Sequence, residues 1–134
     1  MTLVDTNVLL DLTGQDAGWA AWSERALEAA AAREPILIND VVFAELSIGF
    51  DRLENCNGFL ALIQAESLAI PREAFFLTGK VFRAYRCRGG VRAGMLPDFF
   101  IGAHAAVADL PLVTRDARRY RSYFPTLWLI SPEG

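Results

Sequence analysis

Two acidic residues follow short apolar runs that are typical of buried strands. Asp5 closes the run at residues 2–5, and Asp116 stands shortly after the apolar pair at residues 112–113. In open parallel sheets, ligands bind beyond the carboxyl ends of the strands. This placement predicts that both carboxylates lie at a functional edge, although each could instead only cap the helix that follows it.

Two further acids stand in segments that the sequence predicts to be helical. The neighbours of Glu45 at three and four positions are apolar or small, which predicts that its carboxylate faces the protein interior. A buried carboxylate is costly unless a positive group meets it, so a salt bridge or a place at the rim is the structural alternative. Asp98 opens an apolar helix, where it would also complement the helix dipole.

These four carboxylates are more informative together than singly. Like charges that converge at the edge of a sheet repel one another and raise each other's pKa values. A divalent cation resolves this conflict, and hard cations such as Mg²⁺ prefer oxygen ligands. The acids therefore indicate a carboxylate metal site.

The segments that must position these acids alternate between short apolar runs and longer helical ones. This alternation predicts an α/β fold, with one domain over residues 1–134 and a central parallel sheet of four or five short strands with helices on both faces. The expected strands are residues 2–5, 35–39, 68–70, 111–114 and 127–130, and the expected helices are residues 7–12, 19–33, 41–50, 53–64, 72–88, 97–109 and 117–123.

The composition of the 134 residues is that of a protein with a core and no membrane span. Hydrophobic residues make up 53%, and no apolar run reaches the roughly 18–20 residues that cross a bilayer. The N-terminus is typical of a first strand, not of a signal peptide. Cys56 and Cys87 are expected as free thiols and the single histidine, His104, as a structural residue. We therefore expect a soluble, cytoplasmic protein.

The net charge of −3 hides an uneven distribution. Residues 1–79 hold twelve acids and four arginines, whereas residues 80–134 hold four acids and nine bases. All but one of those nine bases are arginine, which suits bidentate contact with phosphate groups. The second part of the chain therefore offers either an anion-binding surface or a solvated helix face with internal salt bridges.

Four segments, in this order and spacing, resemble the PIN domain family, and within it the toxin ribonucleases of VapBC toxin–antitoxin systems. Residues 3–11 carry a D-T-N signature, residues 43–49 an E-L-x-x-G helix, residues 96–105 a third acidic motif, and residues 112–116 a T-x-D motif. The resemblance extends over essentially the whole chain.

This resemblance implies a Mg²⁺- or Mn²⁺-dependent endoribonuclease of VapC type. Its catalytic metal site would comprise Asp5, Glu45, Asp98 and Asp116, supported by Asn7 and Thr114. Divalent metal held by carboxylates can activate a water and stabilise a leaving oxygen, which is the chemistry that phosphodiester cleavage needs. From charge placement, we expect the RNA phosphates to contact Arg83, Arg86, Arg88, Arg92 and Arg115.

The resemblance also implies partners. VapC-type toxins are inhibited by a VapB-type antitoxin that often places a basic side chain in the acidic pocket, and they form homodimers and higher toxin–antitoxin assemblies. Aromatic residues could build such interfaces or belong to the core, namely Trp19, Trp22, Phe59, Phe75 and Phe76. The alternatives are a housekeeping PIN nuclease without an antitoxin and an inactive PIN-like interaction module; the presence of all four acids argues against the latter.

Overall fold

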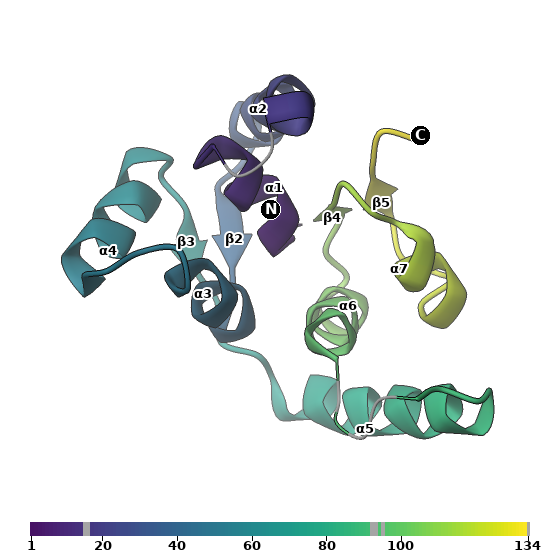
Figure 1. Cartoon of the computed structure of the whole chain (residues 1–134). Coiled ribbons are helices and arrows are strands. Elements are labelled where there is room, and N and C mark those ends of the chain that lie inside the picture. Colours follow the sequence, from purple (N-terminus) through teal and green to yellow (C-terminus); the bar gives the residue numbers. More distant parts are fainter. Residues whose placement is uncertain (15–16, 92–93, 95, 134) are drawn as a thin grey trace.

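Five strands form one parallel sheet in the computed structural model, which describes residues 1–14, 17–91, 94 and 96–133 (Figure 1). The strand order is β3-β2-β1-β4-β5. All four neighbouring pairs are parallel, which confirms the predicted sheet. The strands are β1 (Thr2–Val4), β2 (Ile36–Ile38), β3 (Glu66–Ser67), β4 (Leu112–Val113) and β5 (Leu129–Ile130).

The three central strands are buried, as expected for a parallel sheet covered on both faces. Leu3 of β1 pairs with Leu37 of β2 on one side and with Leu112 of β4 on the other, and all three side chains are buried. The edge strand β3 begins before the apolar run 68–70 that predicted it. Its two residues are exposed, so backbone pairing with β2 defines it rather than apolar content.

The described residues form seven helices, which pack around the sheet. Figure 1 shows α2 on one side of the sheet and α6 on the other, with α5 packed across α6, which confirms the predicted helices on both faces. No described helix is long and apolar enough to cross a membrane. The helices are α1 (Thr6–Leu12), α2 (Ala17–Ala31), α3 (Asp40–Ser47), α4 (Leu53–Leu62), α5 (Arg72–Cys87), α6 (Pro97–Ala108) and α7 (Arg118–Tyr123).

The strand order brings the carboxyl ends of β1 and β4 side by side. Asp5 follows β1 and Thr114 follows β4, so both residues lie at the same edge of the sheet. Beyond β2, the side chain of Asn39 caps α3 by accepting a 3.0 Å hydrogen bond from the backbone N–H of Val42. The helix that carries Glu45 therefore starts at this edge too.

Candidate functional site

Three of the four predicted acids line one pocket of about 330 Å³ at this edge of the sheet. Asp5 reaches it from the end of β1, Glu45 from the middle of α3, and Asp98 from the first turn of α6. Asn7 lines it as well, whereas Asp116 is exposed and lies outside the pocket lining. The fold thus gathers carboxylates from three elements that are far apart in the sequence.

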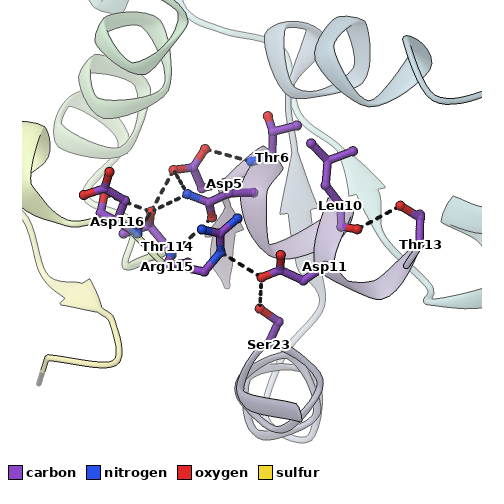
Figure 2. A network of polar contacts seen from close by, with 10 residues as sticks. Asp5, Thr6, Leu10, Asp11, Thr13, Ser23, Thr114, Arg115 and Asp116 are labelled. Atoms are coloured by element: carbon purple, nitrogen blue, oxygen red, sulfur yellow. Dashed lines mark hydrogen bonds and ion pairs between the residues drawn. The ribbon is translucent and has the colours of Figure 1, made fainter. Parts of the chain in front are cut away.

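Asp5 is buried and held in a single orientation. Its Oδ1 accepts from the N–H of Thr6 at 2.7 Å, and its Oδ2 accepts from the hydroxyls of Thr114 at 2.8 Å and Tyr120 at 2.9 Å. Figure 2 shows the bonds to Thr6 and Thr114. Burial, followed by the charge of Asp98, raises the pKa of Asp5 to about 7, and the hydrogen bonds oppose that rise.

Glu45 is half-buried at the rim of the pocket. The hydroxyl of Thr6 donates to its Oε1 at 2.6 Å. Its pKa is raised by burial and by the charge of Asp98, against the effect of Thr6. The prediction of an interior stripe holds for the buried Val42 but not for Ile48, which is 86% exposed and lines the same open pocket as Glu45.

The remaining two acids each contact the segment around α7. Asp98 accepts from Nη1 of Arg119 at 3.0 Å in a partly exposed ion pair. The backbone N–H of Asp116 donates to Thr114 Oγ1 at 3.2 Å, and its Oδ1 accepts from the N–H of Arg118 at 3.3 Å. Asp116 therefore closes the turn that leads into α7 and stands beside Thr114 (Figure 2).

Asn7 and Thr114 join the two central strand ends. The side-chain oxygen of Asn7 accepts from the N–H of Arg115 at 3.1 Å, and its Nδ2 lies 3.4 Å from Thr114 Oγ1. Thr114 also reaches Asp5, so the two predicted supporting residues connect α1 to the segment that follows β4.

Arg115, predicted as an RNA contact, is engaged inside the protein. Its Nε donates at 3.0 Å to Oδ2 of Asp11, which is 1% exposed, and its guanidinium lies 5.7 Å from the centre of the Trp19 ring. Ser23 donates to the same oxygen at 2.7 Å (Figure 2). The sequence offered one indication that Asp11 could reach the same segment as Asn7. Asp11 follows Asn7 by four positions, so the two side chains share a face of α1.

The other predicted arginines lie away from the pocket. Arg83 and Arg86 on α5 and Arg88 just after it are exposed, and none of them lines the pocket. Arg88 lies over the ring of Tyr123 at 4.7 Å and donates to Ser122 at 3.4 Å, so it reaches α7. Arg92 lies outside the described residues.

His104 is fully buried, which agrees with the expected structural role. Its Nδ1 lies 3.1 Å from Nδ2 of Asn39, and burial lowers its pKa. Because the amide nitrogen can only donate, a neutral ring that accepts at Nδ1 fits this contact and orients the oxygen of Asn39 toward α3. Both cysteines are free, as predicted.

The aromatic residues divide between core and surface. Trp22 and Phe59 pack against the core. Phe75 and Phe76, on α5, are 48% and 68% exposed, and Trp19 is 37% exposed. Only the last three therefore remain candidates for a partner interface.

The donor set of the pocket suits a hydrated divalent cation. Within residues 1–14, 17–91, 94 and 96–133, no three Asp, Glu, His or Cys side chains gather closely enough to enclose a metal ion directly. The pocket nevertheless presents three carboxylates, and the charge of Asp98 raises the pKa values of both Asp5 and Glu45. Mg²⁺ keeps several waters and needs few protein ligands, so a cation here would relieve this repulsion.

Comparison with protein families agrees with this geometry. A family model of the PIN domain matches residues 2–124. The chain belongs to the PIN domain family. PIN domains are a nuclease family, generally hydrolytic, and generally use divalent metal ions. In this PIN domain, the carboxylate pocket is the feature that corresponds to such chemistry.

Solved structures share the fold of this PIN domain. VapBC2 from Rickettsia felis, bound to a promoter DNA fragment, matches with a TM-score of 0.73 and 21% identity over 97% of each chain. VapBC-1 from nontypeable Haemophilus influenzae matches with a TM-score of 0.72 and 16% identity over 97% of this chain and 96% of the other. FitAcB from Neisseria gonorrhoeae matches with a TM-score of 0.63 and 20% identity over 99% of each chain. A search of curated proteins finds no match.

Proposed function

We propose that this PIN domain is a metal-dependent endoribonuclease and the toxin of a toxin–antitoxin pair. The observation that carries the proposal is the convergence of Asp5, Glu45 and Asp98 in one pocket at the carboxyl edge of the parallel sheet. Asp116 lies outside the pocket lining and is linked to Asp5 through Thr114, and we propose it as the fourth acid of the site.

The residues of the chain have distinct roles in this proposal. Asp5, Glu45, Asp98 and Asp116 would hold Mg²⁺ or Mn²⁺, directly or through water. When bound, the cation supplies an activated water and stabilises the leaving oxygen of the RNA phosphodiester.

Neighbouring groups prepare two of these acids. Tyr120, Thr114 and the N–H of Thr6 hold the Asp5 carboxylate in one orientation, and the hydroxyl of Thr6 does the same for Glu45. Ligands held in this way need no reorganisation when the cation binds, which favours binding.

The toxin assignment rests on the similar solved structures. They include VapBC complexes, a toxin–antitoxin complex from Klebsiella pneumoniae with 23% identity, and FitAB complexes. We propose by extension a VapB-type antitoxin that inhibits this chain, together with a homodimer and a higher toxin–antitoxin assembly.

An apolar groove beside the acidic pocket supports the antitoxin as a partner. The groove shares Glu45 with the pocket, and its walls include Val41, Ile70, Phe75 and Phe100. A partner that covers this groove is placed to bring a basic side chain to the acids. Apolar contact and charge complementarity would then act together.

The deciding experiment is cleavage of a mixed pool of tRNA, rRNA and mRNA by the purified protein. We expect cuts with Mg²⁺ or Mn²⁺, and none with chelator or with Asp5→Asn and Asp98→Asn. Cleavage that persists in chelator or in both variants would contradict the site. Absence of cuts by the folded wild-type protein in every condition would favour an inactive interaction module.

A further inference from the structure

Helix α7 contacts two of the three pocket acids through consecutive residues. Tyr120 is 1% exposed and donates its hydroxyl to Asp5 at 2.9 Å. The preceding residue, Arg119, donates Nη1 to Asp98 at 3.0 Å. Tyr120 anchors the helix, and Arg119 lies beside the pocket through its bond to Asp98, although it is not itself part of the pocket lining.

Among the described residues, Arg119 uses only a small part of its hydrogen-bonding capacity. Its side chain is 44% exposed and that of Asp98 is 34% exposed, so solvent reaches the ion pair. The contact uses one of the five guanidinium N–H donors. Arg115 differs, because its guanidinium is bound to the buried Asp11.

Asp98 also keeps one oxygen for the pocket. Arg119 occupies Oδ2, and among the described residues no hydrogen bond to Oδ1 is formed. The carboxylate can therefore orient the guanidinium with one oxygen and face the pocket with the other. A pocket of three carboxylates repels a phosphodiester, and a guanidinium at its mouth offsets that repulsion.

We propose that Arg119 binds an RNA phosphate at the mouth of the acidic pocket and that Asp98 positions it. This inference rests on the proposed ribonuclease function and names a substrate contact for it. Guanidinium matches phosphate through two parallel N–H donors, and the single bond to Asp98 leaves such a pair available. Arg119 is not among the five arginines that charge placement predicts as phosphate contacts, and its bond to a pocket acid is what adds it.

The test is binding of a fluorescein-labelled single-stranded RNA of mixed sequence, measured by anisotropy in chelator so that no cleavage occurs. We expect Arg119→Ala to lower the affinity about tenfold at low salt. The slope of log affinity against log salt should become shallower by about 0.7, which corresponds to one lost phosphate contact on a single strand. Arg119→Lys should restore the slope and part of the affinity.

The matched control is Arg121→Ala, which removes the same charge from the same helix. Arg121 bonds to Glu133 at 2.7 Å, so its ion-pair partner, unlike that of Arg119, is not a pocket acid. An equal loss in Arg121→Ala, or unchanged binding by Arg119→Ala, would overturn the inference while leaving the ribonuclease proposal intact. Wild-type protein that binds no RNA in chelator and cleaves none with Mg²⁺ or Mn²⁺ would instead refute the proposed function and the inference with it.

A second readout separates phosphate binding from orientation of a metal ligand. Mn²⁺ binding to the metal-free protein, followed by electron paramagnetic resonance, should be as tight or tighter in Arg119→Ala, since a nearby positive charge is removed. Weaker Mn²⁺ binding would assign Arg119 to orienting Asp98 and overturn the phosphate role.

Discussion

At the scale of single residues, Asp5 combines an electrostatic cost with a rigid environment. It is 4% exposed and lies near the charge of Asp98, and both effects raise its pKa to about 7. Three hydrogen bonds from Thr6, Thr114 and Tyr120 nevertheless hold its carboxylate in place. Such a conflict between charge and burial is typical of functional sites.

The pKa of Asp5 predicts how the stability of the metal-free protein depends on pH. The folded-state pKa is about 7 and the ordinary value is 3.8, so the folded state binds the proton more tightly. Stability from this group is therefore complete below about pH 4 and is lost as the pH rises to 7. Above pH 7 this loss lowers the free energy of unfolding of wild type by an amount on the order of 4 kcal/mol. Asp5→Asn carries no charge at this position and so does not show the loss.

Urea unfolding in chelator at several pH values measures this effect. The free energy of unfolding of Asp5→Asn minus that of wild type should grow with pH up to about 7 and then level off. Above that pH, added Mg²⁺ should stabilise wild type and have no effect on Asp5→Asn. A difference that is flat with pH would show that Asp5 is not destabilised by its charge.

At the scale of elements, the packing of α6 against the end of α7 sets the relative position of Asp98 and Arg119. Gly102 of α6 faces the ring of Phe124, which follows α7 and is 4% exposed. A Cβ built on Gly102 would lie 2.4 Å from that ring, so glycine permits the close approach. The two helices can then each bring a residue to the same pocket.

Gly102→Ala is expected to destabilise the protein by about 1–3 kcal/mol, because the buried ring must shift. Gly79→Ala is the matched control. Gly79 lies within α5 with no atom within 4 Å of its added Cβ, so alanine should gain up to about 1 kcal/mol from helix propensity. Thermal or urea unfolding compares the two, and equal effects would refute the packing argument.

At the scale of the whole molecule, the surface near the acidic pocket combines features that suit RNA and an antitoxin. The pocket shares Glu45 with the apolar groove that Phe75 of α5 lines, and Arg88, just after α5, lies over the ring of Tyr123 in α7. An antitoxin seated over the groove and pocket would cover the proposed cleavage site. Free and complexed chains should therefore differ in activity.

Expression of the wild-type chain without a partner should arrest bacterial growth, since uncontrolled RNA cleavage stops protein synthesis. Asp5→Asn, expressed to the same level, should be harmless, and co-expression of an antitoxin encoded beside the chain should restore growth to wild type. Growth after induction and total RNA integrity are the readouts. Harmless wild-type expression would favour a housekeeping nuclease, and arrest by both variants would separate toxicity from the acidic site.

Short-range patterns in the sequence were enough to predict several features. The buried run at residues 36–38 predicted β2, and the acids at the ends of β1 and in α3 and α6 predicted the pocket lined by Asp5, Glu45 and Asp98. These patterns can be read locally because the periodicity of strands and helices follows from backbone geometry. The carboxyl ends of parallel strands also meet at one edge of a sheet, whatever the rest of the sequence. The edge strand β3 was misplaced because pairing, not apolar content, defines it.

Contacts between residues far apart in the sequence could be found only from the tertiary structure. Asp11 and Arg115 are 104 positions apart, and Asp5 and Tyr120 are 115 apart. No local pattern distinguishes an arginine that pairs with a buried acid from one that faces a phosphate, since both are charged residues beside an apolar strand. The packing of α7 on α6 decides that Arg119, and not Arg115, bonds to the pocket acid Asp98. Only the folded chain specifies that packing.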